Sequence, residues 1–145
     1  MYGYIISRVM GFFYENLKAF QPYEVIASEL IKKIYNVDIV SFCDDARYDF
    51  KDANGTSYEV KTEPSSLRTG NNFIEVFAYG KPSSLSITEA TYYIFCNTTN
   101  YCMISTKKLR ELVKLHGRFI KTKDNLSHGY LVSCSIIIEQ SIELK

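Results

Sequence analysis

Residues 47–61 of this chain, RYDFKDANGTSYEVK, contain the pattern that decides its fold. Apolar and polar residues alternate at 47–51 and again at 57–61, with the two-residue period of a half-buried β-strand. The five residues between them, DANGT, are typical of a hairpin turn. The stretch therefore predicts two antiparallel strands joined by a tight turn.

The length of the turn sets which residues face each other. A two-residue Asn54-Gly55 loop would place Asp49 opposite Val60 and would pair polar positions with apolar ones. A three-residue loop over 53–55, with Gly55 left-handed, buries one whole face of the hairpin, and we prefer it for that reason. It pairs Phe50 with Tyr58 and Asp49 with Glu59. The residues expected on the buried face are Tyr48, Phe50, Tyr58 and Val60; those expected on the opposite, polar face are Asp49, Glu59 and Lys61.

The rest of the chain alternates between helical and extended patterns. Apolar residues at helical spacing predict helices over 4–20 and 23–35, and Ser105 or Thr106 can cap a third helix that runs to about Leu115. The expected extended and loop segments are a short strand or lead-in over 37–42, a polar loop over 64–72, a strand over 73–79, a loop over 80–86, strands over 91–97 and 101–104, and a last β segment over 129–138. This mixture predicts an α/β (α+β) chain.

Composition limits the classes of protein that the chain can belong to. With 145 residues, 46% of them hydrophobic, it is long enough for a single domain with one core, residues 1–145. A net charge of +1 argues against binding nucleic acid by charge alone. Four cysteines without a CxxC pair, and only two histidines, argue against structural zinc and predict free thiols. Charges at 8, 15 and 18 interrupt the apolar N-terminus well short of a membrane span, so we expect a cytoplasmic protein.

The polar face of the hairpin has the chemistry of a metal site. Asp49 and Glu59, directly opposite each other, would repel unless a cation lay between them. Two carboxylates and a carbonyl such as that of Val60 are the oxygen ligands that Mg²⁺ accepts while it keeps several waters. The Lys61 ammonium could then stabilise an attacking hydroxide or the charge that develops on a phosphate. The simpler interpretation is that Glu59 and Lys61 are solvated strand residues, but the opposed Asp49 and the helix before the hairpin favour a site.

These residues resemble a known family. Asp49 followed by Glu59-Val60-Lys61 after a hairpin, behind an amphipathic helix, is similar to the PD-(D/E)xK nuclease superfamily, which includes restriction endonucleases and Holliday junction resolvases. The resemblance covers about 23–97, and Tyr48 stands where the motif has proline. It implies a restriction-endonuclease-like core, with a central mixed β-sheet flanked by helices and with 98–145 adding a C-terminal helix and strand. It also implies Mg²⁺ or Mn²⁺ held by Asp49 and Glu59, with Lys61 assisting the attack of water on a phosphodiester.

Further acidic residues are candidates for the same site. Family members often add a helix glutamate, for which we favour Glu24 over Glu29, although either could be a surface residue. Glu75 interrupts the apolar strand 73–79, on the face of Phe73 and Phe77, and is either a water-facing edge residue or a supplementary acid on the strand next to that of Glu59. Residues 70–75 and 81–84 also look like segments of some phage-encoded nucleases, which suggests a viral or phage member.

The candidate substrate contacts are basic residues beside the site and on the flanking loops: Arg47, Lys51, Arg68 and Lys81. We expect them to converge on one face and bind the phosphates of nucleic acid, DNA rather than RNA. The expected function is metal-dependent hydrolysis of DNA, structure-selective or restriction-like, with a homodimer as one assembly. The alternatives are an RNA endonuclease with the same core and a catalytically silent nucleic-acid-binding or interaction module.

Overall fold

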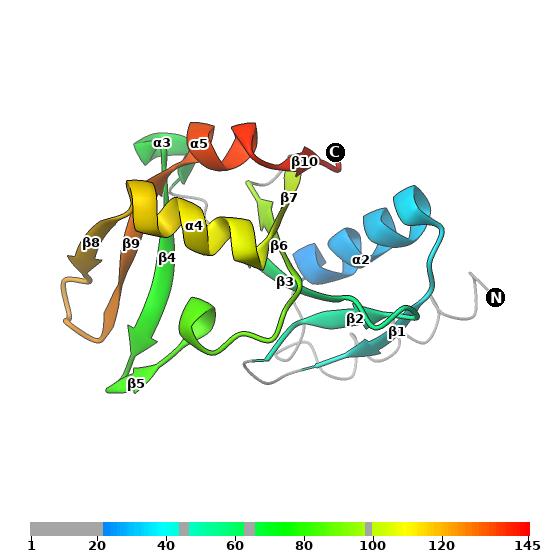
Figure 1. Ribbon diagram of the computed structural model, residues 1–145, viewed down its shortest axis with the longest axis horizontal. Helices are drawn as coiled ribbons and strands as arrows, with labels where there is room; N and C mark the ends of the chain where they lie inside the picture. The colour runs from blue at the N-terminus through cyan, green and yellow to red at the C-terminus, as the bar shows by residue number, and fades with distance from the viewer. Residues whose placement is uncertain (1–21, 44–46, 63–65, 98–99) are drawn as a thin grey trace.

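The computed structural model describes residues 22–43, 47–62, 66–97 and 100–145 (Figure 1). The helix expected over 4–20 lies outside these residues. The helix expected over 23–35 is present as α2 (Pro22–Tyr35). Its Pro22 occupies the first helical position, where the missing N–H costs nothing because that group has no partner within the helix.

The main sheet has six strands in the order β1-β2-β3-β6-β7-β10. Their bounds are β1 (Ile39–Phe42), β2 (Phe50–Asp52), β3 (Ser57–Thr62), β6 (Tyr92–Cys96), β7 (Tyr101–Ser105) and β10 (Ile142–Glu143). The central pair β3–β6 is parallel, whereas the other neighbours are antiparallel. The fold is therefore α/β with a central mixed sheet, in agreement with the predicted class.

A second sheet is built from strands that lie far apart in the sequence. Its order is β5-β4-β9-β8, and all of its pairs are antiparallel. The bounds are β4 (Asn71–Ala78), β5 (Lys81–Pro82), β8 (Arg118–Lys121) and β9 (Ser127–Ser133). β4 and β5 therefore lie within the connection that joins the parallel strands β3 and β6.

The two faces of the main sheet are covered by different elements (Figure 1). On one face, Ala27 and Ile31 of α2 pack on alternate residues of the central strands, including Tyr58 and Val60. On the other face lie Tyr93 and Phe95 of β6, together with α4 (Thr106–His116), α5 (Cys134–Glu139) and the second sheet. Both faces are thus buried, as is usual for a sheet with a parallel core.

The hairpin has the predicted register within its strands, whereas Asp49, expected opposite Glu59, lies just outside the ladder and donates its N–H to the Tyr58 carbonyl at 2.8 Å. Phe50 pairs with Tyr58, and Lys51 with Ser57. The turn is the three-residue loop over 53–55: the N–H of Asp52 donates to the carbonyl of Thr56 at 2.9 Å, and Gly55 has φ +83°. A left-handed third residue is what this hairpin type requires, and glycine adopts that conformation without strain.

Several expectations outside the hairpin are wrong. The polar loop over 64–72 contains the short helix α3 (Ser66–Thr69), and the loop over 80–86 contains β5 and the 3₁₀ turn η1 (Ser84–Ser86). The strand β8 was not foreseen. The β segment expected over 129–138 ends at Ser133, after which the chain forms α5.

The helix expected from Ser105 or Thr106 is confirmed as α4. Ser105 is its cap, and its side chain accepts from the N–H of Lys108.

Candidate active site

Glu59 and Lys61 lie on the face of the main sheet that is turned toward the second sheet. The parallel register pairs Glu59 with Tyr93 and Lys61 with Phe95, whose side chains pack on that side. In a half-buried hairpin this face would be open to solvent. Here it is largely covered: Glu59 is only 9% exposed, and Lys61 is half-buried. The expected burial of the opposite face holds for Phe50, Tyr58 and Val60, whereas Tyr48 is only half-buried.

One oxygen of Glu59 is paired and the other is not. Lys61 Nζ lies 3.1 Å from Glu59 Oε1. Glu59 Oε2 is buried and has no hydrogen-bond partner among the described residues. A buried carboxylate oxygen without a donor is costly. Glu59 is therefore placed as a ligand or acceptor would be, and the ion pair alone does not satisfy it.

Asp49 lies at the edge of the hairpin, immediately before β2. Its Oδ2 accepts a hydrogen bond of 2.6 Å from the backbone N–H of Val60. Burial and the negative charge of Glu59 raise the pKa of Asp49 from 3.8 to about 7, although the Val60 hydrogen bond and Lys61 act in the opposite direction. The charge of Glu59 thus acts on Asp49, although Asp49 lies outside the paired residues of β2 and β3.

The other two ionisable groups respond to the same neighbourhood. Burial raises the pKa of Glu59, while the charge and hydrogen bond of Lys61 lower it in part. For Lys61, burial alone would lower the pKa, but the charge and hydrogen bond of Glu59, with smaller effects from Tyr93 and Asp49, raise it. The site therefore favours one shared proton or cation between the carboxylates and keeps the lysine charged.

The oxygen atoms present fit a divalent cation. Asp49 and Glu59 supply two carboxylates, one with the unpartnered Oε2. The carbonyl of Val60 points to the same side of β3 as its N–H, which is the side of Asp49. The described part of the chain contains no group of three His, Cys, Asp or Glu side chains that could hold a metal. Mg²⁺ needs only one or two carboxylates and fills its other positions with water, so the smaller donor set remains compatible with it.

Glu75 is a residue of β4, in the second sheet. It was expected on the strand next to that of Glu59, which is wrong: β4 belongs to the second sheet, and the neighbours of β3 are β2 and β6. Glu75 and Lys61 nevertheless line one cavity of about 130 Å³. The Glu75 carboxylate is fixed by two hydroxyls, with Ser83 donating to Oε2 at 2.9 Å and Ser127 donating to Oε1 at 3.1 Å. A bulge between Glu75 and Phe77 breaks the alternation from which their shared face was expected.

The helix glutamates are not brought to this face. α2 packs on the side of Tyr58 and Val60, opposite to Glu59 and Lys61. Glu24 and Glu29 are both half-buried on that helix. Neither forms a metal-binding cluster with Asp49 and Glu59 in the described residues.

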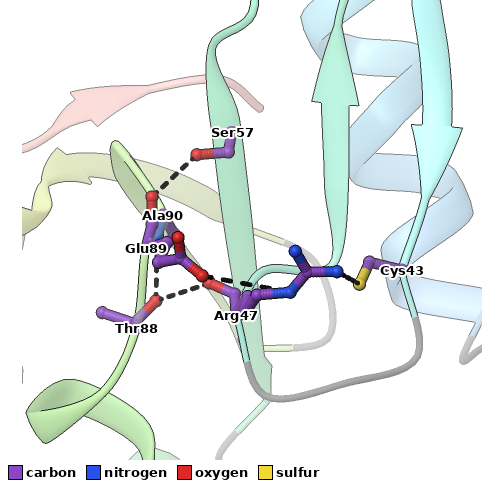
Figure 2. A network of polar contacts seen from close by, with 6 residues as sticks. All are labelled: Cys43, Arg47, Ser57, Thr88, Glu89 and Ala90. Carbon is purple, nitrogen blue, oxygen red and sulfur yellow. Dashed lines mark hydrogen bonds and ion pairs between the residues drawn. The ribbon is translucent and has the colours of Figure 1, made fainter.

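Arg47 fixes the segment that carries Asp49 (Figure 2). Its carbonyl accepts from the Thr88 hydroxyl at 3.1 Å and from the N–H of Glu89 at 2.8 Å. Its guanidinium lies 3.9 Å from the Glu89 carboxylate and 3.7 Å from Cys43 Sγ. These contacts hold the start of β2 against the segment before β6, so Arg47 has a structural role besides its expected one of binding phosphate.

The other candidate phosphate contacts are spread over the molecule. Lys51 Nζ lies 4.8 Å from the centre of the Tyr48 ring, beside the hairpin. Arg68 is exposed on α3 before β4, and Lys81 is exposed on β5 after it. Since the eight residues of β4 separate them by roughly 23 Å, the structure does not bring Arg68 and Lys81 together.

Tyr93 is the residue that sequence reasoning missed. It lies in the apolar strand 91–97, which looks like uniform core, yet it lines the cavity with Lys61 and Glu75. A signal was present: a tyrosine in a buried strand must place its hydroxyl somewhere. Recognising it required the parallel register with Glu59, which the sequence alone does not supply.

Comparison with known proteins adds no assignment. No protein-family model and no curated protein matches the chain. In the described residues, no helix is long and apolar enough to cross a membrane.

Proposed function

We propose that the protein is a divalent-metal-dependent endonuclease that hydrolyses DNA phosphodiester bonds, structure-selective or restriction-like, with Mg²⁺ or Mn²⁺ as its cofactor. One observation carries the proposal. Two carboxylates, the half-buried Asp49 and the buried Glu59, repel each other beside Lys61, and Glu59 Oε2 has no partner among the described residues. The mixed sheet also agrees with the core that the PD-(D/E)xK resemblance implies.

A purely structural role accounts poorly for this group. A partly buried ion pair such as Glu59–Lys61 adds little stability even when every atom is satisfied. Here one carboxylate oxygen has no donor and a second carboxylate adds repulsion. Perturbed acids of this kind are concentrated at functional sites.

Each residue of the site would have a separate role in hydrolysis. Asp49, Glu59 and the carbonyl of Val60 would hold the metal ion, which when bound supplies an acidified water and charge for a phosphoryl oxygen. Lys61 holds its ammonium beside Glu59, where it stabilises negative charge on the attacking oxygen or on the phosphate. Water adds to phosphorus and loses a proton, the bond from phosphorus to one sugar oxygen breaks, and that oxygen takes up a proton. Glu75, fixed by two serines, lines the same cavity as Lys61 and would serve as a supplementary acid.

Two alternatives use the same residues. An RNA endonuclease would need the same acids and lysine, so only the substrate separates it from a DNA enzyme. A silent nucleic-acid-binding or interaction module would retain the fold but gain nothing from the repelling carboxylates. Dimerisation and a viral or phage source remain expectations from the resemblance.

The deciding experiment is incubation of the purified protein with single-stranded, duplex and branched DNA and with RNA, in Mg²⁺, in Mn²⁺ and in EDTA. We expect cleavage of DNA in either metal and none in EDTA. Lys61→Ala is the control for a contaminating nuclease, because it leaves Asp49 and Glu59 in place. Cleavage that Lys61→Ala retains in full would refute the assignment at this site, and cleavage of RNA alone would establish the first alternative.

A further inference from the structure

Tyr93 carries a buried hydroxyl that the fold does not use. The residue is 1% exposed, and its Oη has no hydrogen-bond partner among the described residues. Burial raises the pKa of Tyr93, and the nearby Ser84 hydroxyl, the Lys61 charge and the Thr88 hydroxyl lower it only in part. Neither hydroxyl reaches hydrogen-bond geometry with Oη. A buried tyrosine hydroxyl normally finds a partner. The described part of the chain therefore leaves this hydroxyl available to a bound group.

The Tyr93 hydroxyl and the carboxylate oxygen Glu59 Oε2, both without a partner among the described residues, come from neighbouring side chains. Tyr93 is paired with Glu59 across the parallel strands, so the two side chains project from the same face as neighbours. Of the buried side-chain atoms in the described ranges, Glu59 Oε2 and Tyr93 Oη are those left without partners. Their adjacency points to one missing ligand or reacting group.

The space beside Tyr93 suits a phosphate group. The cavity of about 130 Å³ is also lined by Lys61, Ser84 and Glu75. Glu75 already accepts from two serine hydroxyls. The remaining groups, an ammonium and two hydroxyls, can all donate, and a phosphodiester has only acceptor oxygens. Ser84 is held there with φ +44°, a conformation that costs energy in a non-glycine residue and that is found at functional sites.

We propose that this cavity is the subsite for the scissile phosphate and that the Tyr93 hydroxyl donates a hydrogen bond to one of its non-bridging oxygens. The inference rests on the proposed nuclease function and adds to it a neutral donor from β6. A neutral donor suits a site that already holds three carboxylates, because a phenol is protonated at neutral pH and adds no further negative charge.

The test compares two tyrosine-to-phenylalanine variants on the same strand. Tyr93→Phe removes the unpartnered hydroxyl and keeps the ring. Tyr92→Phe removes a hydroxyl from the opposite face, where Tyr92 stacks on Tyr58 with ring centres 5.9 Å apart. For each we would measure the melting temperature, the single-turnover cleavage rate in Mg²⁺, and the affinity for fluorescent duplex and branched DNA in Ca²⁺.

We expect Tyr93→Phe to melt at or above the wild-type temperature, since it loses no hydrogen bond of the folded chain. Its cleavage rate should fall about 10- to 100-fold, the usual effect of one hydrogen bond to a charged group. Tyr92→Phe should cleave like the wild type. An unchanged rate in Tyr93→Phe, or a melting temperature clearly below that of Tyr92→Phe, would overturn the inference.

The outcome for Tyr93 can be separated from that of the proposed function. If the wild type cleaves DNA, Lys61→Ala does not, and Tyr93→Phe is unaffected, the nuclease assignment stands and the phosphate subsite is rejected. If the wild type cleaves nothing, the nuclease assignment fails and DNA affinity in Ca²⁺ decides the subsite. A tenfold weaker affinity of Tyr93→Phe would then support a phosphate contact, and equal affinities would reject it.

Discussion

Replacing Asp49 by asparagine should stabilise the protein in the absence of metal. The amide keeps the size of the side chain, and its oxygen can still accept from the N–H of Val60. Only the charge is lost. Because the pKa of Asp49 is raised from 3.8 to about 7, each pKa unit being worth about 1.4 kcal/mol, ionising it in the folded chain costs at most about 4 kcal/mol.

The sign of the pH dependence follows from proton linkage. Between about pH 4 and pH 7 the folded protein binds this proton and the unfolded chain does not, so the wild type loses stability as the pH rises through that window. Asp49→Asn lacks this loss. The difference between the two should be small near pH 4, grow up to about pH 7 and then level off, at up to roughly 10 °C in melting temperature for a chain of this size.

The assay is thermal or urea unfolding in EDTA from pH 4 to pH 8. Asp52→Asn is the matched control: this buried aspartate accepts from two backbone N–H groups and from the Tyr58 hydroxyl, and its replacement should destabilise by about 1 kcal/mol. Parallel stability curves for the wild type and Asp49→Asn, or a less stable Asp49→Asn at pH 8, would refute the repulsion between Asp49 and Glu59.

Three further outcomes are expected. Millimolar Mg²⁺ or Mn²⁺ should raise the wild-type melting temperature, because a cation at a concentration of 100 Kd adds about 2.7 kcal/mol to the free energy of unfolding. The melting temperature of Asp49→Asn should rise less. A wild-type melting curve that neither metal shifts would argue against a cation site. Lys61→Ala should lose about 10²-fold or more in cleavage rate with a far smaller loss of DNA affinity, and Lys61→Arg should not restore the rate; equal losses of rate and affinity would mark an ordinary phosphate anchor. Gly129→Ala should unfold at a clearly lower temperature, because the added Cβ would lie 2.3 Å from the Ile74 carbonyl oxygen and 2.5 Å from the Phe73 ring, and a melting curve equal to that of the wild type would show that β4 can move away.

The hairpin could be predicted because everything that determines it is local. Alternation fixes which residues share a face, and Gly55 fixes the loop, so the pairing of Phe50 with Tyr58 follows from 15 consecutive residues. Metal binding and catalysis remain predictions.

The surroundings of the hairpin could not be predicted in the same way. β4 pairs with β9, which follows it by 49 to 62 residues, so the location of Glu75 in the same cavity as Lys61 depends on contacts that no local pattern encodes. Residues 134–138, Cys-Ser-Ile-Ile-Ile, have strand propensity but form a helix that buries Ile137, since tertiary packing overrides a weak local preference.

The parallel pairing of β3 with β6 has a consequence for the order in which the protein folds. Tyr58 and Tyr92 are paired although they are 34 positions apart in the sequence, and Asn71 and Ser133 are paired across 62 positions. Such distant pairings form slowly, because the intervening chain must close into a loop and lose conformational entropy before the new contacts compensate for that loss. The hairpin with Asp49 and Glu59 can form early, whereas the walls contributed by Tyr93 and Glu75 come together late. In a nascent chain, the hairpin that carries Asp49 and Glu59 would therefore form well before the cavity lined by Tyr93 and Glu75.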